Sequence, residues 1–334
     1  MILDKFRTLT RTAFIGATAA VIAVSAPARA ETDTIRLDFA YYNPVSLVLK
    51  EQGLLEQAFK ADGIDVEWVQ SHGSNKALEF LNAGGIDFGS TAGAAALLGK
   101  INGIPIKSIY VYSRPEWTAL VTRPDTGIQK VEDLKGRTVA VTRGTDPYIF
   151  LLRSLAAVNL SEQDLNVVLL QHPDGKNALV NGDVDAWAGL DPYMAQAELE
   201  NDAVLFHRDA SQNTWGILNV REEFARENPQ LVERVLTIYE QARKWSLEHP
   251  DELRAILVKA AKLDDEVAAK QLGERTELTH SVIGAEQRES ILAAGLVLQQ
   301  AGVIKPDVDV TATVDALIDP QYSERVAKKL AASL

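Results

Sequence analysis

The sequence predicts an α/β protein of two lobes, in which each lobe is a mainly parallel sheet flanked by helices. Short apolar strands alternate with helical segments through the first two thirds of the chain, a pattern typical of parallel sheets with crossover helices. Beyond about residue 221 the pattern is almost entirely helical. Chains of roughly 300 residues bury most of their surface and usually divide into two lobes.

The N-terminal segment has the pattern of an export signal. Lys5, Arg7 and Arg11 precede an apolar run over residues 13–26, and Ala28-Arg29-Ala30 supplies a small-x-small cleavage pattern. The run is shorter than the roughly 20 apolar residues that a membrane span requires. We therefore expect residues 1–30 to be a signal peptide cleaved near Ala30, and the mature chain to work outside the cytoplasm.

The charge and cysteine content exclude several functions. The chain has 34 basic and 46 acidic residues and a net charge of −12, and removing the signal, with four basic residues and one acidic residue, makes this −15. Lys and Arg are not clustered into the basic patch that a phosphate backbone requires, so no nucleic-acid partner is expected. Because the chain has no cysteine, disulfides, cysteine nucleophiles and thiolate metal sites are excluded.

The predicted first lobe is built from strand–helix units. Ile35, Leu37 and Phe39 alternate along the first strand, and Asn43-Pro44 then begins a helix, because proline is favoured in a first helical turn. Further strands are predicted over 66–69, 86–89 and 106–111, with helices over 74–82 and 92–100.

The predicted second lobe repeats this alternation. Strands are expected over 118–122, 138–141, 166–170, 186–188 and 204–206, with helices over 148–158, 176–180 and 193–199. A strand over 215–220 precedes the helical tail, which should pack on the first lobe, so that the chain crosses between the lobes twice. The expected domains are 31–117 with 221–334 for the first lobe and 118–220 for the second.

Three junctions that follow strands are rich in small hydroxyl residues. A helix N-terminus has unpaired N–H groups and a partial positive charge, so it accepts an oxyanion without a basic side chain. Ser, Thr and Asn at these positions are also ordinary N-caps, which is the alternative at each junction. The candidate ligand contacts there are Tyr42, Asn43 and Ser46 after the first strand, Ser90 and Thr91 after the third, and Gly144, Thr145, Asp146 and Tyr148 in the second lobe.

Aromatic side chains near strand ends are the second kind of candidate. Trp187 and Trp215 are expected to line a small-molecule site, with core packing as the alternative for each. Asp191 follows Trp187 and is either a helix cap or a contact across the cleft.

Several segments together resemble a known family. In order they are GLLEQAF, ALEFLNAGGIDFGSTAG, VEDLKGRTVAVTRGT, GDVDAWAGLDPY and A-x-x-NPQLV. From about Ile35 to Trp245 the chain resembles the periplasmic substrate-binding proteins of ABC importers for aliphatic sulfonates, taurine and nitrate. The resemblance implies a type II-like binding protein with two hinge crossings, a ligand closed between the lobes, and a permease partner in the inner membrane.

The resemblance also implies where the ligand is held. Carried over by position, contacts fall at Tyr42-Asn43, Ser90-Thr91, Gly144-Thr145, and Trp187 with Asp191. The chain departs from the family where Asp146-Pro147 follows Thr145. Asp146 either complements the helix dipole in the first turn or faces the cleft, where it would pair with an amine such as that of taurine.

The predicted function is capture of a small sulfonate, taurine or an alkanesulfonate, by a periplasmic monomer without metal or cofactor. The alternatives are a binding protein for a nitrate-like anion or a thiamine-precursor pyrimidine, a ligand-sensing domain, and a secreted enzyme. The five histidines show neither metal-ligand spacing nor proximity to a Gly-x-Ser-x-Gly elbow, so an enzyme is not expected.

Overall fold

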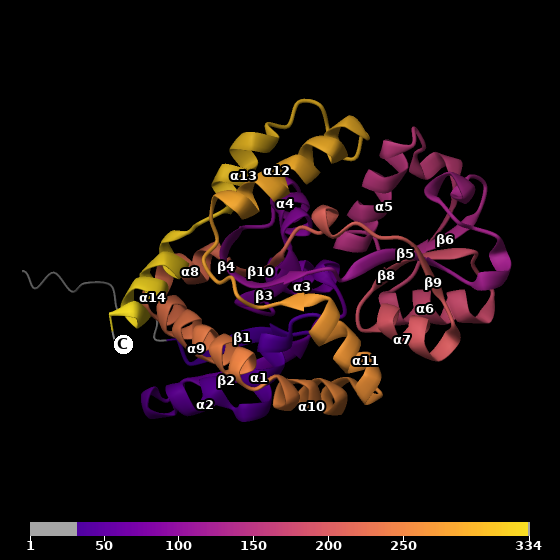
Figure 1. The fold of residues 1–334 in the computed structure, drawn as a ribbon. Coiled ribbons are helices and arrows are strands. Elements are labelled where there is room, and N and C mark those ends of the chain that lie inside the picture. Colours follow the sequence, from indigo (N-terminus) through magenta and orange to yellow (C-terminus); the bar gives the residue numbers. More distant parts are fainter. Residues whose placement is uncertain (1–31, 333–334) are drawn as a thin grey trace, which may run out of the picture. The chain divides into compact units, whose positions relative to one another are not determined.

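The computed structural model describes residues 32–332, and the predicted signal peptide lies outside the described residues. The described chain contains two sheets with helices on their faces, which confirms the predicted fold class (Figure 1). No helix among these residues is both long and apolar enough to cross a membrane.

The first sheet has six strands. Parallel pairing joins β1 (Thr34–Phe39) to β2 (Asp65–Gln70) and β3 (Phe88–Ala92), as the strand–helix units predict. Antiparallel pairing joins β10 (Gly216–Arg221) to β3 and to β4 (Ile106–Pro115), and the short β11 (Thr276–Glu277) to β4. The order is β11-β4-β10-β3-β1-β2.

The second sheet has five strands in the order β7-β6-β8-β5-β9. Strand β6 (Thr138–Val141) pairs in parallel with β7 (Asn166–Leu169) and β8 (Ala186–Leu190). Strand β5 (Thr118–Thr122) pairs antiparallel with β8 and with β9 (Val204–His207). Both sheets are therefore mixed: β10 and β11 run against the other strands of the first sheet, and β5 runs against the other strands of the second.

The chain passes between the sheets twice. The first crossing joins β4 to β5 through Glu116-Trp117, and the second joins β9 to β10 through residues 208–215. Because β4 and β10 are paired, the two crossings leave the first sheet side by side. The structure places β10 in the first sheet, although the predicted second lobe extends to residue 220; the division into domains stays a prediction.

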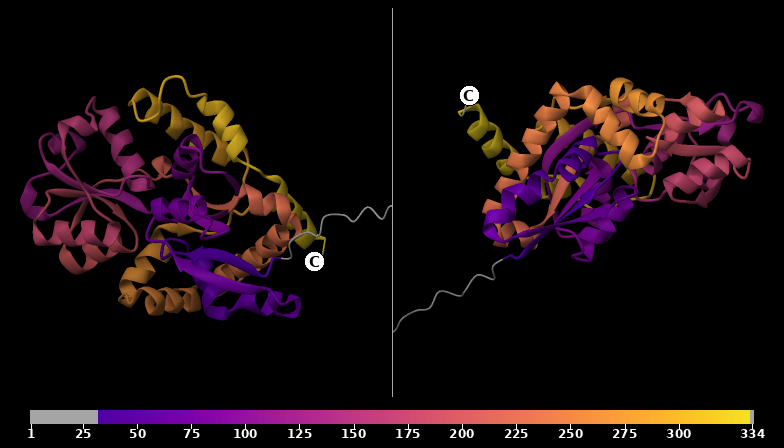
Figure 2. Two further views of the ribbon diagram at one scale, coloured as in Figure 1. Left: turned by 180° about the vertical axis from the view of Figure 1, so that it is seen from behind. Right: turned by 90° about the horizontal axis from the view of Figure 1, so that it is seen from below.

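Helices cover both sheets (Figures 1 and 2). Around the first sheet they are α1 (Pro44–Gln52), α2 (Leu54–Phe59), α3 (Ser74–Asn82), α4 (Gly93–Ile101), α8 (Glu222–Glu227) and α9 (Pro229–Glu248). Around the second sheet they are α5 (Asp146–Ala157), α6 (His172–Asn181) and α7 (Tyr193–Asn201).

The C-terminal tail contacts both lobes. It comprises α10 (Pro250–Ala261), α11 (Asp265–Ala269), a π-helical turn (Lys270–Glu274), α12 (Ala285–Gln300), α13 (Val310–Leu317) and α14 (Gln321–Ala331). As expected, it packs on the first lobe, where α14 contacts α9 and α13 contacts α4. It also reaches the second lobe, because α12 contacts α5 and α11 contacts α7.

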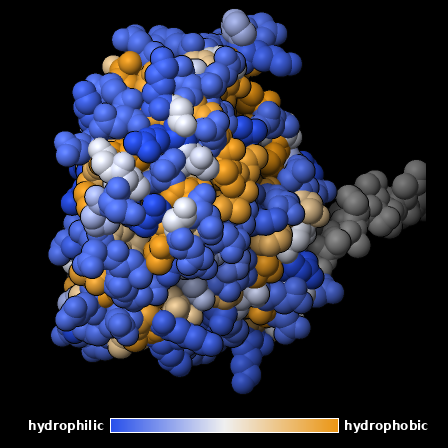
Figure 3. Space-filling model, turned by 90° about the vertical axis from the view of Figure 1, so that its right-hand side faces the viewer, coloured by the Kyte–Doolittle hydropathy of each residue, from blue (hydrophilic) through white to orange (hydrophobic). Residues whose placement is uncertain are grey.

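Apolar burial without disulfides holds the two sheets. The largest cluster runs from Ile35 and Phe88 of the first sheet through Trp117 of the first crossing to Val139 of the second. A second cluster surrounds Trp187, which is fully buried. The face seen in Figure 3 is mostly hydrophilic, with hydrophobic residues in patches between.

Candidate functional site

Three helix N-termini meet where the two lobes face each other. Helix α3 begins after Gly73 in the first lobe, and α5 and α6 begin after Thr145 and Gln171 in the second. A Cβ atom built on Gly73 would lie 3.2 Å from the His172 ring, and one built on Gly144 would lie 3.5 Å from Cβ of Asn75. The partial positive ends of helices from both lobes therefore approach a common region.

The turn before α5 is shaped by its sequence. Gly144 has φ +80°, a left-handed conformation that glycine adopts without a steric penalty. Thr145 is the N-cap, but its hydroxyl donates to the carbonyl of Thr142 at 2.6 Å and makes no bond to the helix. Pro147 in the first turn has no N–H and fixes a helical φ. The result is a helix end whose first N–H groups are not capped by a side chain.

A small cavity lies at this meeting point. Its volume is about 10 Å³, roughly the space for one water molecule. It is lined by Tyr42, Ser74, Trp117, Thr145, Asp146, Pro147 and Leu190. The described conformation is therefore closed, and a solute with several heavy atoms requires the lobes to separate.

A larger hollow of about 1360 Å³ lies next to the cavity. It includes Asn75 and Gly144, whose neighbours Ser74 and Thr145 line the small cavity. Its apolar wall includes Leu78 and Leu98 from the first lobe, Leu152 from the second, and Ile304 and Val308 from the tail. Once the lobes separate enough to admit a polar head at the small cavity, the hollow can accept an apolar group attached to that head.

The N-terminus of α4 is already satisfied within the chain. The N–H of Gly93 donates to the carbonyls of Thr214 at 2.9 Å and Trp215 at 3.2 Å, and the N–H of Ala94 donates to Oγ1 of Thr214 at 3.0 Å. Ser90 donates from its N–H and its hydroxyl to Oδ1 of Asp38, at 2.9 and 2.8 Å. The Thr91 hydroxyl accepts from Asn219 at 2.8 Å. This junction therefore lies inside a buried polar network.

The junction after β1 is likewise internally bonded. Asn43 caps α1, since its Oδ1 accepts from the N–H of Ser46 at 3.2 Å. Its Nδ2 donates to the hydroxyls of Ser90 and Tyr239, each at 2.7 Å. The Ser46 hydroxyl donates to the Asn43 carbonyl at 2.6 Å. Of the three candidates here, Tyr42 lines the cavity, and its hydroxyl donates to the Ser90 carbonyl at 3.0 Å.

Asp146 lines the cavity, but both of its oxygens are bonded to the chain. Oδ2 accepts from the Trp117 indole at 2.9 Å and from the N–H of Thr214 at 3.1 Å, and Oδ1 accepts from the Thr214 hydroxyl at 2.6 Å. Burial raises the pKa of Asp146 above its usual value of 3.8, and these bonds offset only part of the rise. Because Trp117 and Thr214 belong to different crossings, one carboxyl group connects both crossings to the start of α5.

The remaining candidates lie apart from the cavity. Tyr148 and Gly144 line the larger hollow, and the Tyr148 hydroxyl donates to Glu162 at 2.8 Å. Trp187 lies in the core of the second lobe. Trp215 packs edge-on against His280, with ring centroids 4.9 Å apart.

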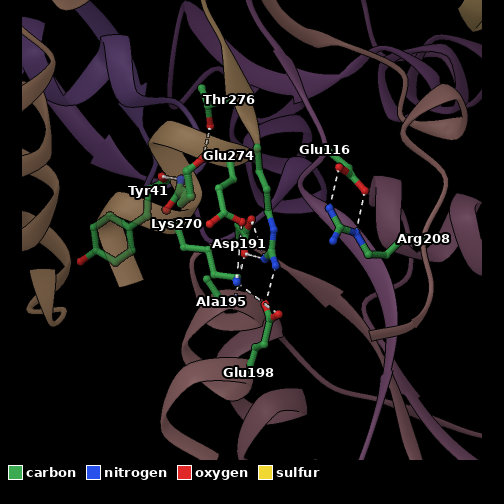
Figure 4. A network of polar contacts seen from close by, with 11 residues as sticks. Tyr41, Glu116, Asp191, Ala195, Glu198, Arg208, Lys270, Glu274 and Thr276 are labelled. Atoms are coloured by element: carbon green, nitrogen blue, oxygen red, sulfur yellow. Dashed lines mark hydrogen bonds and ion pairs between the residues drawn. The ribbon is translucent and has the colours of Figure 1, made fainter. Parts of the chain in front are cut away.

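Asp191 belongs to an ion-pair network between the tail and the second lobe (Figure 4). Its oxygens accept from Nη1 of Arg275 at 3.1 and 3.4 Å, and Oδ1 also accepts from the N–H of Ala195 at 2.9 Å. Both charged side chains are 1% exposed. Burial raises the pKa of Asp191, and the Arg275 guanidinium opposes that rise.

Some contributors to the site were not among the predicted ligand contacts. Ser74 and Trp117 line the cavity, and His172 begins the third of the converging helices. The Gly73-Ser74 pair after a strand carries the same signal as the three predicted junctions. His172 has no local signal, because its approach to Gly73 depends on how the lobes pack. Among the described residues, no three His, Cys, Asp or Glu side chains form a group suited to a metal ion.

Two mixed α/β lobes joined by paired crossings, with helix N-termini facing each other across the interface, define the class of two-lobed solute-binding proteins. A family model described as NMT1/THI5 like matches residues 57–253, more than half of the chain. The chain belongs to the NMT1/THI5-like family.

Relatives with assigned names agree with this class. A protein of Bacillus subtilis (strain 168), provisionally named an aliphatic sulfonates-binding protein, is 31% identical over 240 residues, covering 71% of this chain and 72% of its own. A protein of Escherichia coli (strain K12) with the same provisional name is 27% identical over 271 residues, covering 80% of this chain and 83% of its own.

Solved structures show the same fold. The alkanesulfonate-binding protein SsuA from Xanthomonas axonopodis pv. citri, bound to MOPS, superposes with a TM-score of 0.78 at 23% identity, covering 87% of this chain and 99% of that one. The fold is not restricted to binding proteins, since the desulfurization enzyme DSZB matches with a TM-score of 0.65 at 15% identity, over 89% of this chain and 99% of that one. The site, rather than the fold, has to indicate the function.

Proposed function

We propose that the chain captures a small sulfonate, taurine or an alkanesulfonate, between its two lobes and delivers it to an ABC permease in the inner membrane. The observation that carries this proposal is that the N-termini of α3 and α5 line one cavity between the lobes, while the N-terminus of α6 approaches that of α3 at Gly73. Sulfonate oxygens would accept from the free N–H groups of these first turns. The names of the relatives point to the same ligand class.

The negative net charge does not oppose this binding. Exposed carboxylates beyond about 8 Å are largely screened at physiological salt, whereas N–H donors act at contact distance in a water-poor site. Charge-assisted hydrogen bonds contribute roughly 1.5–3 kcal/mol each. Three or four of them support micromolar or tighter binding once the cost of association is met.

The larger hollow would hold the organic part of the solute. Its wall is partly apolar and comes from both lobes and the tail, so a ligand lying there bridges the lobes and favours the closed conformation. Tyr42, Thr145 and Asp146 are the predicted contacts that lie at the cavity, and we add Ser74 and Trp117.

Unfolding in the presence of candidate ligands tests the function. A sulfonate at 100 times its dissociation constant is expected to raise the free energy of unfolding by about 2.7 kcal/mol. Nitrate, sulfate and a thiamine-precursor pyrimidine serve as alternatives in the same melts. A response to the pyrimidine or nitrate with none to any sulfonate would reject the sulfonate assignment. Recovery of the bound sulfonate unchanged, by mass spectrometry, separates binding from turnover.

Gly73→Ala tests the position of the site. The added methyl group would lie 2.8 Å from Oδ1 of Asn75 and 3.2 Å from the His172 ring on the opposite lobe, both closer than an ordinary contact. Calorimetric titration is expected to show affinity for sulfonates reduced about tenfold, or about 1.4 kcal/mol, because closure is hindered. Gly85→Ala is the matched control, since its methyl group would lie 3.6 Å from the nearest atom, the Phe80 carbonyl oxygen. Unchanged affinity in Gly73→Ala would place the ligand elsewhere.

We also propose that the chain is exported to the periplasm as a monomer after cleavage near Ala30. The basic residues, apolar run and small-x-small pattern of residues 1–30 support cleavage. N-terminal sequencing and light scattering of the exported protein check these two points.

A further inference from the structure

His172 is a buried side chain at the site with one ring nitrogen left over. It is the first residue of α6 and is 0% exposed. Its Nδ1 lies 3.2 Å from Oγ1 of Thr142, whereas its Nε2 has no hydrogen-bond partner within the chain. Buried polar atoms are rarely left unpaired, so the free Nε2 requires an explanation.

The hydroxyl next to Nδ1 determines whether Nε2 of His172 is a donor or an acceptor. Oγ1 of Thr142 also lies 2.7 Å from the carbonyl oxygen of Leu170, which only accepts. One hydroxyl hydrogen cannot serve both neighbours, so both contacts are satisfied only if Thr142 donates to Leu170 and accepts from Nδ1–H of His172. Nε2 then carries a lone pair. Burial, with a smaller effect from His72, lowers the pKa of His172 to about 3, so the ring is neutral near pH 7.

A second unpaired acceptor faces the same point from the other lobe. Oδ1 of Asn75 is buried and has no partner within the chain. A Cβ atom built on Gly73 would lie 2.8 Å from this oxygen and 3.2 Å from Nε2 of His172. Two unpaired acceptors, one from each lobe, thus lie close to each other beside the Cα atom of Gly73.

We propose that the solute carries a hydrogen-bond donor, an ammonium or hydroxyl group, that is received by Nε2 of His172 and Oδ1 of Asn75 as the lobes close. This inference rests on the proposed function and narrows its ligand class to sulfonates that bear such a donor. It assigns donor recognition to His172 and Asn75 rather than to Asp146, whose oxygens are already bonded to Trp117 and Thr214. A ligand without a donor leaves both acceptors buried and unpaired, which disfavours closure.

Calorimetric titration with three sulfonates of equal chain length tests this proposal. Taurine and isethionate bear an ammonium and a hydroxyl group, whereas ethanesulfonate bears neither. The wild-type protein is expected to bind taurine or isethionate at least about tenfold more tightly than ethanesulfonate. His172→Phe, which keeps a ring but removes the acceptor, is expected to reduce this preference to less than about threefold. Asn75→Leu provides a second variant, on the other lobe, should His172→Phe fail to fold.

His207→Phe is the matched control. His207 is a second histidine of the same lobe with a buried and unpaired Nε2, but it lies on β9 and packs against Phe150, with ring centroids 5.4 Å apart. It is expected to keep the wild-type preference.

The outcomes separate this inference from the proposed function. Equal affinity of the wild-type protein for all three sulfonates overturns donor recognition and leaves sulfonate binding intact. An equal loss for all three in His172→Phe also overturns it, because the ring would then contact the sulfonate group. No binding of any sulfonate overturns the proposed function, and with it the inference.

Discussion

Replacing Arg275 with Met is expected to lower the free energy of unfolding by about 3–5 kcal/mol in denaturant titrations. The substitution leaves the Asp191 carboxylate, which is 1% exposed, without its counter-ion. Removing one partner of a buried ion pair leaves an uncompensated charge that water cannot reach. The helix N-terminus at Ala195 compensates only in part, through the single bond at 2.9 Å.

Two comparisons make this result specific. The double variant Arg275→Met with Asp191→Asn removes both charges and is expected to recover most of the lost stability. Arg288→Met breaks the exposed pair with Asp315, which is expected to contribute little to stability because both charges reach solvent. If Arg275→Met and Arg288→Met lower the free energy of unfolding by the same amount, the buried pair does not stabilise the contact between the tail and the second lobe.

Asp38 is expected to make the protein less stable as the pH rises from 4 to 7. Burial raises the pKa of this carboxyl from 3.8 to about 6, against the lowering effect of its bonds to Ser71 and Ser90. The folded chain therefore holds the proton more tightly than the unfolded chain. Its contribution to stability is complete below about pH 4 and is lost as the pH passes 6, a change of roughly 3 kcal/mol.

Asp38→Asn isolates this contribution, because the amide keeps the shape and does not titrate. The free energy of unfolding of wild type minus that of the variant is expected to fall by roughly 2.5 kcal/mol between pH 4 and pH 7. The difference is needed because the lowered pKa of His172 acts in the opposite direction, destabilising the fold as the pH falls below about 6.5. Asp315→Asn is a control of opposite sign, since Arg288 lowers the pKa of Asp315. If the free energies of unfolding of wild type and Asp38→Asn change in parallel with pH, Asp38 is ionised throughout this range.

The sequence predicts the order of strands and helices well, because apolar periodicity is local. The sequence is a poorer guide where long-range strand pairing decides whether a segment forms a strand or a loop. Residues Gly89–Thr91 have the composition of a ligand loop but form the buried strand β3, since β10 arrives from far along the chain and pairs Leu218 with Ser90. The same long-range packing gives Thr214 the role of capping α4.

The site divides in the same way. The turn at Gly144-Thr145 was predictable from its glycine, hydroxyl and proline, and it lies at the interface. The approach of Gly73 and Asn75 to His172 was not predictable. The first two lie in one lobe and His172 lies in the other, and no local sequence pattern encodes how the lobes pack. The hydrogen bonds from both crossings to Asp146 could not be predicted either, because their donors, Trp117 and Thr214, are distant from Asp146 in the chain.

The side-by-side exit of β4 and β10 limits how the lobes can move. Any opening has to bend residues 116–117 and 208–215 together, which favours rotation about a single axis near Trp117 and Thr214. The first turn of α5 is fastened to that axis through one carboxyl group, and it also forms a wall of the cavity. A solute held against this turn, as proposed above, would therefore be coupled through Asp146 to the axis about which the lobes rotate.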